Sequence, residues 1–248
     1  ATFVRHVEIH DTLGSTNDEA ANQALRDADE GLCVIARQQS AGRGRQGRSW
    51  VSEPDVGLYF SIVLRPTIGR EQLGLITLMA GIAVHDTLKE FGVSPDIKWV
   101  NDVLVNDKKI SGILAEAMET PTGLAVIVGI GINLPSDNFP AEIAETATSI
   151  EAETGKRPTP DDVARHLTGH LSHFCALLDN TAGHAAIIDE WRRRSSYYSD
   201  KRVRVTLTDD AIEGITDGLE ANGALRVKLA DGSVEIVQAG DVERLRET

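Results

Sequence analysis

Apolar and polar residues along the chain follow two periods, one typical of strands and one typical of helices. Runs rich in β-branched and aromatic residues predict strands at 32–36, 57–64, 97–100, 103–105, 110–115 and 124–130. Apolar residues that recur at helical spacing predict helices at 71–91, 161–178 and 185–194, the first of them amphipathic and lying on a sheet. The whole pattern predicts an α+β fold in which helices cover a mixed, mostly antiparallel sheet.

Polar residues between these runs predict where elements begin and turn. Ser15, Thr16 and Asn17 precede a short helical stretch, and Thr16 and Glu19 have the spacing of a capping box. Asn followed by Asp at 106–107 predicts a tight turn between two strands.

The pattern changes from Lys201 onward, where short β-runs are separated by turn signals. Asp217-Gly218, Asn222-Gly223 and Asp231-Gly232 recur at short intervals and predict tight turns. Such short strands are typical of a small β-barrel. Because a chain of 248 residues exceeds the usual size of one domain, we expect two domains, 1–197 and 198–248.

Composition narrows the class of protein. Hydrophobic residues make up 41% and charged residues 25% of the chain, as in ordinary globular proteins, and the formal net charge of −13 argues against bulk binding to nucleic acid. Cys33 and Cys175 lack C-x-x-C spacing, which favours a reducing cytoplasm over a disulfide framework. The apolar run at 73–84 is too short to cross a membrane, so we expect no membrane partner.

The densest chemical signal is the loop Gly42–Trp50, called the Gly-Arg loop below, whose glycines have G-x-G-x-x-G spacing. A dinucleotide fingerprint would need a helix after the loop and an acidic residue about 20 positions on, but a strand follows and Thr67 stands there. The partner motifs of a kinase glycine loop are absent. Three arginines within six residues remain, and guanidinium groups suit carboxylate and phosphate oxygens. Alone, such a loop would more often be a solvated basic surface.

Two further clusters favour an anion site over a solvated loop. Lys98–Asp102 places a cation, an amide and a carboxylate at a strand end, and Lys109 and Gly112 follow across the predicted hairpin. Gly129–Asn133 ends a strand with glycines that allow a ligand to approach the backbone. Together the clusters predict one site for a polyanion.

These residues, in this order, closely resemble the biotin protein ligase family. The matching motifs are Ser15–Asn17, Gln39, Ala41–Trp50, Lys98–Asp102, Lys109 with Gly112–Leu114, and Gly129–Asn133. The resemblance implies a class II synthetase-like catalytic domain over 1–197 and an SH3-like barrel over 198–248. One departure is Val100, which stands where the family usually has Pro; it adds an N–H and frees one φ angle.

The resemblance also implies an activity. Biotin and ATP would form biotinyl-5'-AMP, and the biotinyl group would pass to a lysine of the biotin carboxyl carrier protein of acetyl-CoA carboxylase or a similar carboxylase. Mg²⁺ would arrive with the ATP phosphates, and no metal ligands are assigned. The protein would be cytoplasmic, bind no nucleic acid and no membrane, and could form a homodimer through an exposed sheet edge.

Roles for individual residues follow from the same resemblance. The catalytic residues would be Lys109, Arg45, Lys98 and Asp102. Biotin would be bound by Ser15, Thr16, Asn17, Gln39, Arg43, Gly44, Arg45, Lys109 and Gly112. ATP would be bound by Gly42, Arg43, Arg45, Arg48, Trp50, Lys98, Asn101 and Asn133.

Two other functions stay open at this point. A related lipoate or octanoate ligase or transferase is the first alternative, although the Gly-Arg loop and the terminal barrel argue against it. The second is a DNA-binding repressor, because some biotin ligases carry a helix-turn-helix module before the catalytic domain. We expect a monofunctional ligase, since only about 14 residues precede Ser15, too few for that module.

Several other residues have ordinary structural explanations. His166, His170 and His173 share one face of a predicted helix, but no acidic ligand or H-E-x-x-H pattern accompanies them, so we expect a solvated face and not a metal site. Cys33 lies in an apolar strand and is expected in the core. Arg192–Arg194 end a helix, where positive charge favours the helix dipole.

Overall fold

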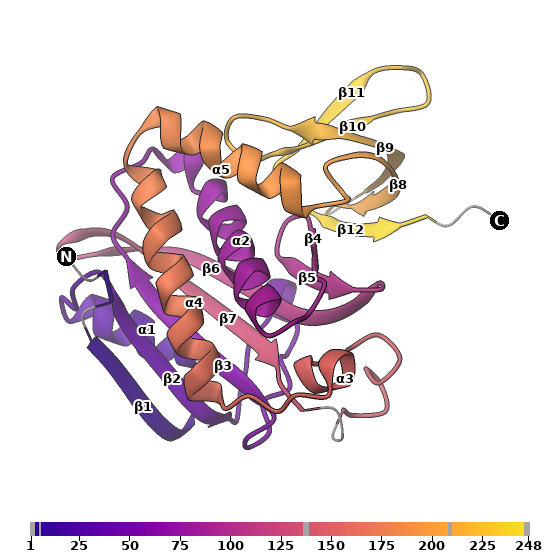
Figure 1. Cartoon of the computed structure of the whole chain (residues 1–248). Helices are drawn as coiled ribbons and strands as arrows, with labels where there is room; N and C mark the ends of the chain where they lie inside the picture. Colours follow the sequence, from indigo (N-terminus) through magenta and orange to yellow (C-terminus); the bar gives the residue numbers. More distant parts are fainter. Residues whose placement is uncertain (1–2, 5, 136–138, 208–209, 246–248) are drawn as a thin grey trace.

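Two sheets organise the molecule (Figure 1). The computed structural model describes residues 3–4, 6–135, 139–207 and 210–245. The first sheet has the order β1-β2-β3-β7-β6-β5-β4 and consists of β1 His6–Leu13, β2 Leu32–Gln39, β3 Gly57–Leu64, β4 Asp96–Lys98, β5 Asp102–Val105, β6 Lys108–Thr120 and β7 Gly123–Asn133. Because β1 and β2 pair in parallel and the other neighbours pair antiparallel, the expected mixed α+β fold is confirmed.

The second sheet forms the C-terminal part of the chain. Its order is β11-β10-β9-β8-β12, and it consists of β8 Ser199–Thr206, β9 Ala211–Leu219, β10 Leu225–Lys228, β11 Val234–Val237 and β12 Asp241–Arg244. All of its pairs are antiparallel. The expected small C-terminal β domain is present, while the boundary between 197 and 198 stays a prediction.

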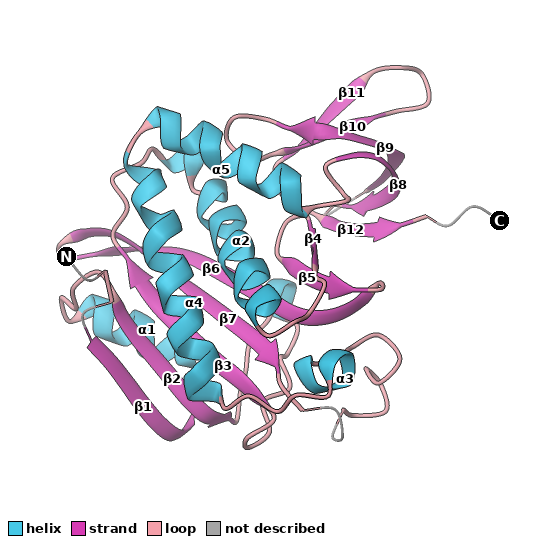
Figure 2. Ribbon diagram, in the orientation of Figure 1, coloured by secondary structure: helices cyan, strands magenta, loops and turns pink. Residues whose placement is uncertain are grey.

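Helices cover the two faces of the large sheet unequally (Figure 2). They are α1 Thr16–Leu25, α2 Gly74–Glu90, α3 Ile150–Thr154, α4 Pro160–Cys175 and α5 Thr181–Arg194. Alternate residues of β7 face different layers, because successive side chains of a strand point to opposite faces. Val128 and Ile130 belong to the main core with α2, whereas Ala125 and Ile127 pack against α1.

Beyond Ile127, the α1 face of β7 carries Gly129 and Gly131 in place of large side chains. On the neighbouring strand β6, Gly112 is the direct cross-strand partner of Gly131. The sheet therefore presents a bare floor beside the first turn of α1, and this floor positions the candidate site.

The helix expected at 71–91 is present as α2, but it is not amphipathic. Most of its residues are buried, since the sheet lies on one side and α4 and α5 pack on the other. A helix that is hydrophobic on all sides is typical of a fully enclosed position.

Two expected local motifs are wrong. Ser15, not Thr16, is the N-cap of α1, and its side chain makes no capping hydrogen bond, so the capping box does not form. Asp217-Gly218 lies inside β9 at an irregularity in its pairing with β8, with Gly218 at φ 93°, and is not a turn. Asn222-Gly223 and Asp231-Gly232 do join strands, as expected.

The face of α4 that carries histidines does have an acidic neighbour, which corrects the expectation. His166 Nδ1 and His170 Nε2 both contact the carboxylate of Glu90 at the end of α2, His170 at 2.9 Å. In the part of the chain that the structure describes, no group of three or more His, Cys, Asp or Glu side chains could hold a metal ion. The contact joins two helices through hydrogen bonds.

Two further expectations concern the cysteines and membrane-spanning segments. Cys33 and Cys175 are free and buried, and burial raises the pKa of the Cys33 thiol to about 12. Among the described residues, no helix has the length and apolar composition needed to cross a bilayer.

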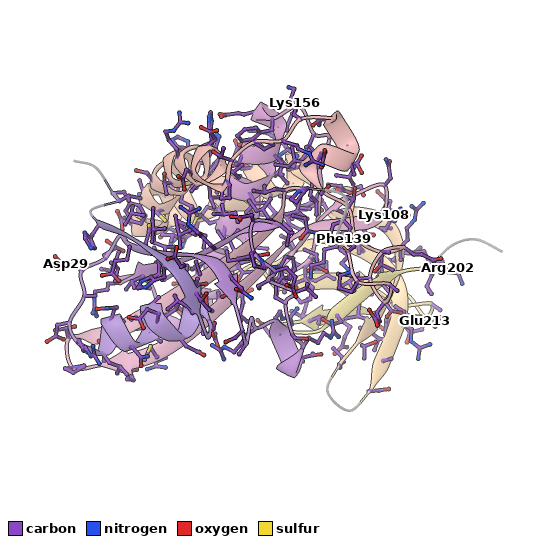
Figure 3. All side chains as sticks on the ribbon, turned by 90° about the horizontal axis from the view of Figure 1, so that it is seen from below. Asp29, Lys108, Phe139, Lys156, Arg202 and Glu213 are labelled. Carbon is purple, nitrogen blue, oxygen red and sulfur yellow. The ribbon has the colours of Figure 1, made fainter. Side chains whose placement is uncertain are left out.

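The C-terminal sheet docks on the first turns of α2 through a buried turn. Trp99 Nε1 donates to the carbonyl of Gly223 at 3.0 Å, and Trp99 is 2% exposed. Gly223 has φ 87°, and a Cβ there would lie 2.8 Å from Leu78 Cδ1, so the turn needs glycine. Arg202 and Glu213 of this sheet lie at the opposite end of the molecule from Asp29 (Figure 3).

Candidate active site

A cavity of about 120 Å³ lies over the bare floor of the sheet. It brings together most of the residues expected at the site, from α1, β2, the Gly-Arg loop, β6 and the turn before β5: Ser15, Thr16, Asn17, Gln39, Arg43, Gly44, Arg45, Arg48, Trp50, Asn101, Asp102, Lys109 and Gly112. Asn133 and Lys98 line neighbouring cavities. Gly42 lines none of the described cavities and instead forms the neck of the loop, where its carbonyl accepts from Trp50 N at 2.9 Å.

One end of the cavity is a connected network of polar side chains. Gln39 Oε1 accepts from Thr16 N at 2.8 Å, and Gln39 Nε2 donates to Ser52 Oγ at 2.8 Å. The buried Ser61 hydroxyl lies 2.8 Å from Thr16 Oγ1 and 2.7 Å from Asn17 Oδ1. Because the amide oxygen can only accept, the Ser61 hydroxyl donates its proton to Asn17 Oδ1. The side-chain oxygens of Thr16 and Asn17 are thus bound to neighbouring side chains of the sheet and not to N–H groups of α1.

The network fixes the orientation of the Asn17 amide, and Thr16 and Asn17 both line the cavity. Both amide hydrogens of Asn17 are used, because Nδ2 donates to Leu114 O at 3.3 Å and to Glu116 Oε2 at 2.8 Å. A carbonyl oxygen has two lone pairs, and Ser61 uses one. Asn17 Oδ1 and Thr16 Oγ1 can therefore accept hydrogen bonds from N–H groups of a ligand.

Carboxylates of the chain itself hold the three loop arginines. Arg43 contacts Glu116 and lies 3.0 Å from Asp18 Oδ1. Arg48 contacts Asp241 of β12. Carboxylates from α1, from the large sheet and from the C-terminal sheet thus fasten the loop.

Arg45 is the most enclosed of these arginines. Its Nη1 donates to Asn101 Oδ1 at 2.9 Å and to Gly240 O at 3.3 Å, and it lies 3.5 Å from Asp241 Oδ1. The Arg45 side chain is 19% exposed. A guanidinium held in this way is oriented toward the cavity before any ligand binds, which reduces the ordering that binding requires.

Trp50 lies flat on the glycine floor. A Cβ on Gly131 would be 2.4 Å from Trp50 Cε2, and a Cβ on Gly112 would be 2.9 Å from Trp50 Cζ3, so the indole fits only because both positions are glycine. Lys109 Nζ lies 5.4 Å from the centre of the Trp50 ring, within cation–π range. The buried Trp50 N–H has no hydrogen-bond partner among the described residues.

Asp102 connects the two site lysines. Its carboxylate lies 2.6 Å from Lys109 Nζ and 3.2 Å from Lys98 Nζ. Burial alone would raise the pKa of Asp102, but the two ammonium groups outweigh it and hold the pKa below its usual value. An ionised carboxylate that is already paired twice is a weak proton acceptor, so its geometry suits positioning the lysines.

Two asparagines hold the surrounding backbone. Asn101 Nδ2 donates to Ile113 O at 3.0 Å, while Ile113 N donates to Asn101 O at 2.9 Å. Asn133 Nδ2 donates to Thr148 O at 2.9 Å and faces Lys109 O at 3.4 Å. Asn133 thus fixes the segment beside Lys109.

A second cavity, of about 180 Å³, lies on the other side of Trp50. Its walls are mostly apolar and include Val51, Val56, Phe139 and Ile143. Trp50 and Lys109 line both cavities, so the two spaces meet at these side chains.

Sequence reasoning missed three residues that shape the site. Ser61 is polar in an otherwise apolar strand run, which is a usable signal. Glu116 follows the matched Gly112–Leu114 motif by two positions, on the same face of β6, and could have been found from strand alternation. Asp241 gave no signal, because its role depends on how the C-terminal sheet docks.

The chain is similar to proteins of known name over most of its length. Residues 11–133 match the model of the Biotin/lipoate A/B protein ligase family, and residues 198–245 match that of the Biotin protein ligase C terminal domain. The chain is 34% identical over 217 residues to Biotin--[acetyl-CoA-carboxylase] ligase of Paracoccus denitrificans, which covers 84% of this chain and 88% of that protein.

A second relative is longer than the match. The chain is 40% identical over 168 residues to Bifunctional ligase/repressor BirA of Bacillus subtilis, covering 66% of this chain and 51% of that protein, so it spans about half of that relative. Among solved structures, the biotin protein ligase from Aquifex aeolicus in complex with biotin and ATP superposes with a TM-score of 0.83 at 27% identity, covering 98% of this chain and 100% of that one.

Proposed function

Since the chain belongs to the biotin protein ligase family, we propose that it is an ATP-dependent biotin protein ligase. It would activate biotin as biotinyl-5'-AMP and transfer the biotinyl group to a lysine of a biotin carboxyl carrier protein. The relative from Paracoccus denitrificans is named for acetyl-CoA carboxylase, which supports a carboxylase as the acceptor.

The observation that carries this proposal is a pair of acceptor oxygens at the start of α1, in the same cavity as a group of cations. Thr16 Oγ1 and Asn17 Oδ1 can accept from the two N–H groups of a cyclic urea such as the biotin ring. Lys109 and Arg45 line the same cavity and suit the carboxylate and the phosphates. One small cavity thus offers both kinds of recognition that the first half-reaction requires.

In the first half-reaction, the biotin carboxylate attacks the α-phosphorus of ATP and pyrophosphate leaves. Two anions must approach each other, so cations that are already in place lower the barrier. Arg45 is held by Asn101 and Gly240, and Lys109 is held by Asp102, so neither needs to be ordered during the reaction. We assign Arg48 and Lys98 to the departing phosphates.

In the second half-reaction, an acceptor lysine attacks the acyl carbonyl and AMP leaves. The mixed anhydride must be protected from water until then. The Gly-Arg loop, fastened by Glu116 and Asp241, supports such protection because it closes over the cavity from two sides.

The apolar second cavity is our proposed place for the adenine end of the nucleotide. It meets the first cavity at Trp50 and Lys109, where the acyl phosphate would lie. Mg²⁺ would be carried by the ATP phosphates, because the nearby carboxylates Asp102 and Asp241 are already paired with lysine and arginine.

Further proposals concern organisation and setting. We propose a ligase domain at 1–197 and a barrel domain at 198–248, which the two separate family matches support. A homodimer could form along β1, one of the two edge strands of the large sheet, where Ile9 is 54% exposed. A cytoplasmic setting fits two buried free thiols and the need for ATP.

The activity test compares biotin with two other acids. With biotin, ATP and Mg²⁺ but no carrier, the protein should release pyrophosphate and retain biotinyl-5'-AMP. Lipoate and octanoate, the acids of the alternative function, should give no retained adenylate. They lack the two N–H groups that would donate to Thr16 Oγ1 and Asn17 Oδ1. Retention of a lipoyl adenylate but no biotinyl adenylate would contradict the proposal.

A further inference from the structure

Lys109 lies where three cavities meet. Two of them are the site cavity and the apolar cavity described above. The third has a volume of about 340 Å³ and lies between the β5–β6 hairpin and β12, so we call it the β12 cavity. Its walls include Asp102 and Lys109 at the inner end and Glu243 and Arg244 of the C-terminal sheet.

We propose that the β12 cavity is the path by which the acceptor lysine of the carrier protein reaches the acyl carbonyl. This inference rests on the proposed function. The acyl adenylate would occupy the first two cavities, and the β12 cavity is the remaining described cavity that reaches Lys109.

The walls of the β12 cavity suit a long aliphatic side chain that ends in a cation. Leu104 and Val242 are apolar and almost fully buried, at 6% and 2% exposure. Carboxylates of Asp107 and Glu243 line the same cavity. A lysine can lay its methylene groups on apolar surface while its charged end passes polar groups.

The inner end of the cavity favours loss of the lysine proton. The ammonium groups of Lys98 and Lys109 lie there, beside the carboxylate of Asp102. An ammonium group that arrives next to two others is disfavoured, so its pKa falls and the neutral amine is favoured. The amine nitrogen then forms a bond to the acyl carbon, the bond from that carbon to the phosphate oxygen breaks, and AMP leaves with the electron pair. The proton lost from the ammonium group and the second proton lost as the amide forms both pass to water.

This path also gives the C-terminal sheet a function. Its strand β12 contributes Asp241 to the site cavity and Glu243 with Arg244 to the β12 cavity. Arg244 in turn lies 3.2 Å from Asp107 of the β5–β6 turn, which holds the two walls of the cavity together. Docking of the sheet would therefore shape the acceptor path as well as fasten the Gly-Arg loop.

Site-directed labelling can close this cavity in folded protein. Glu243→Cys would be modified with a bulky thiol reagent, and Glu235→Cys on the exposed strand β11 is the matched control. Both natural cysteines are buried, and burial raises the pKa of each thiol, so the label should go to the new cysteine. Adenylate formation without carrier, and transfer from preformed adenylate to the carrier domain, would be measured before and after labelling.

Labelling at position 243 should slow transfer by about 100-fold, as expected when a reacting group is displaced, relative to its effect on adenylate formation. Labelling at position 235 should change neither rate. Equal transfer rates before and after labelling at 243 would overturn the proposal, and so would an equal loss of both half-reactions. Failure of the unlabelled natural chain to form any adenylate would instead contradict the proposed function.

Discussion

At the scale of single residues, the cations of the site are already paired with carboxylates of the chain. Arg43 contacts Glu116, Arg48 contacts Asp241, and Lys109 pairs with Asp102. Such pairs hold the cations in place without proton transfer. The anionic oxygens of a ligand can bind the same cations beside these carboxylates or in their place. Each pair can be tested separately.

Arg45→Ala should impair adenylate formation or retention by about 100-fold, the usual cost of removing one donor that stabilises developing charge. The change removes hydrogen bonds to Asn101 and Gly240 as well as the cation. Pyrophosphate exchange and adenylate lifetime are the measurements, with Arg37→Ala on β2, where the arginine is 57% exposed, as control. Natural exchange rates together with an unchanged lifetime would contradict the assigned role.

Asp102→Asn should lower the free energy of unfolding at pH 7 by about 1–2 kcal/mol, because it leaves the ammonium groups of Lys98 and Lys109, which are 21% and 35% exposed, without their carboxylate partner. The folded pKa of Asp102 lies below its unfolded value of about 4. This stabilisation is therefore present above that unfolded value and is lost as the pH falls through the folded pKa.

Urea unfolding of the natural chain and the Asp102→Asn variant at neutral and acid pH would test this sign. The difference in unfolding free energy should shrink in acid. Asp11→Asn, at a side chain that is 96% exposed, is the control and should show little difference at either pH. If this difference in unfolding free energy grew in acid, the assigned pKa direction of Asp102 would be contradicted.

At the scale of elements, strand alternation decides where the site forms. On the α1 face of β7, Ala125 and Ile127 pack under α1. The next two residues on this face, Gly129 and Gly131, have no side chain and leave the backbone of the sheet uncovered by its own residues. Trp50 occupies this floor because a glycine of β6 lies opposite Gly131. Local pattern and cross-strand register together produce the cavity.

Gly131→Ala should displace Trp50, since the added Cβ would lie 2.4 Å from Trp50 Cε2. Biotin affinity should fall by about tenfold or more, which is 1.4 kcal/mol. Tryptophan emission should shift to the red, and the change reports Trp50 because Trp99 and Trp191 are 2% and 0% exposed. Gly169→Ala on α4, with open space around its Cα, is the control. Unchanged emission and unchanged biotin affinity would contradict the claim that Trp50 packs on Gly131 and shapes the site.

The sequence predicted most elements and the motif residues of the site, for identifiable reasons. The strands and α2 carry strong periodic signals, and the Gly-Arg loop and Lys98–Asp102 have distinctive spacing. Strand β1 was missed because it is an outer strand with largely polar, exposed residues, and α3 because it has only five residues. Asp241 could not be predicted, since its contact with Arg48 spans 193 positions along the chain.

At the scale of the whole molecule, the C-terminal sheet is attached directly to the motifs of the site. Trp99 lies between Lys98 and Asn101, the residue that accepts from Arg45, and it donates to Gly223 O in the buried turn of that sheet. Asp241 of β12 contacts the Gly-Arg loop. Docking of the second sheet and order in the site should therefore depend on each other.

Trp99→Phe should lower the free energy of unfolding by about 1–3 kcal/mol more than Trp191→Phe. Both residues are buried tryptophans, but Trp191 Nε1 has no hydrogen-bond partner among the described residues, whereas Trp99 Nε1 donates to Gly223 O. The difference between the variants in denaturant unfolding isolates the hydrogen bond that docks the sheet. Equal losses would show that this bond contributes nothing.

The most direct test of the central claim is to weigh the acceptor. The protein would be incubated with biotin, ATP, Mg²⁺ and a biotin carboxyl carrier domain, and the carrier analysed by mass spectrometry. Our account predicts one added biotinyl group, on the acceptor lysine, and none when ATP is left out or lipoate replaces biotin. An unmodified carrier in the complete mixture, or a carrier that gains a lipoyl group instead, would contradict it.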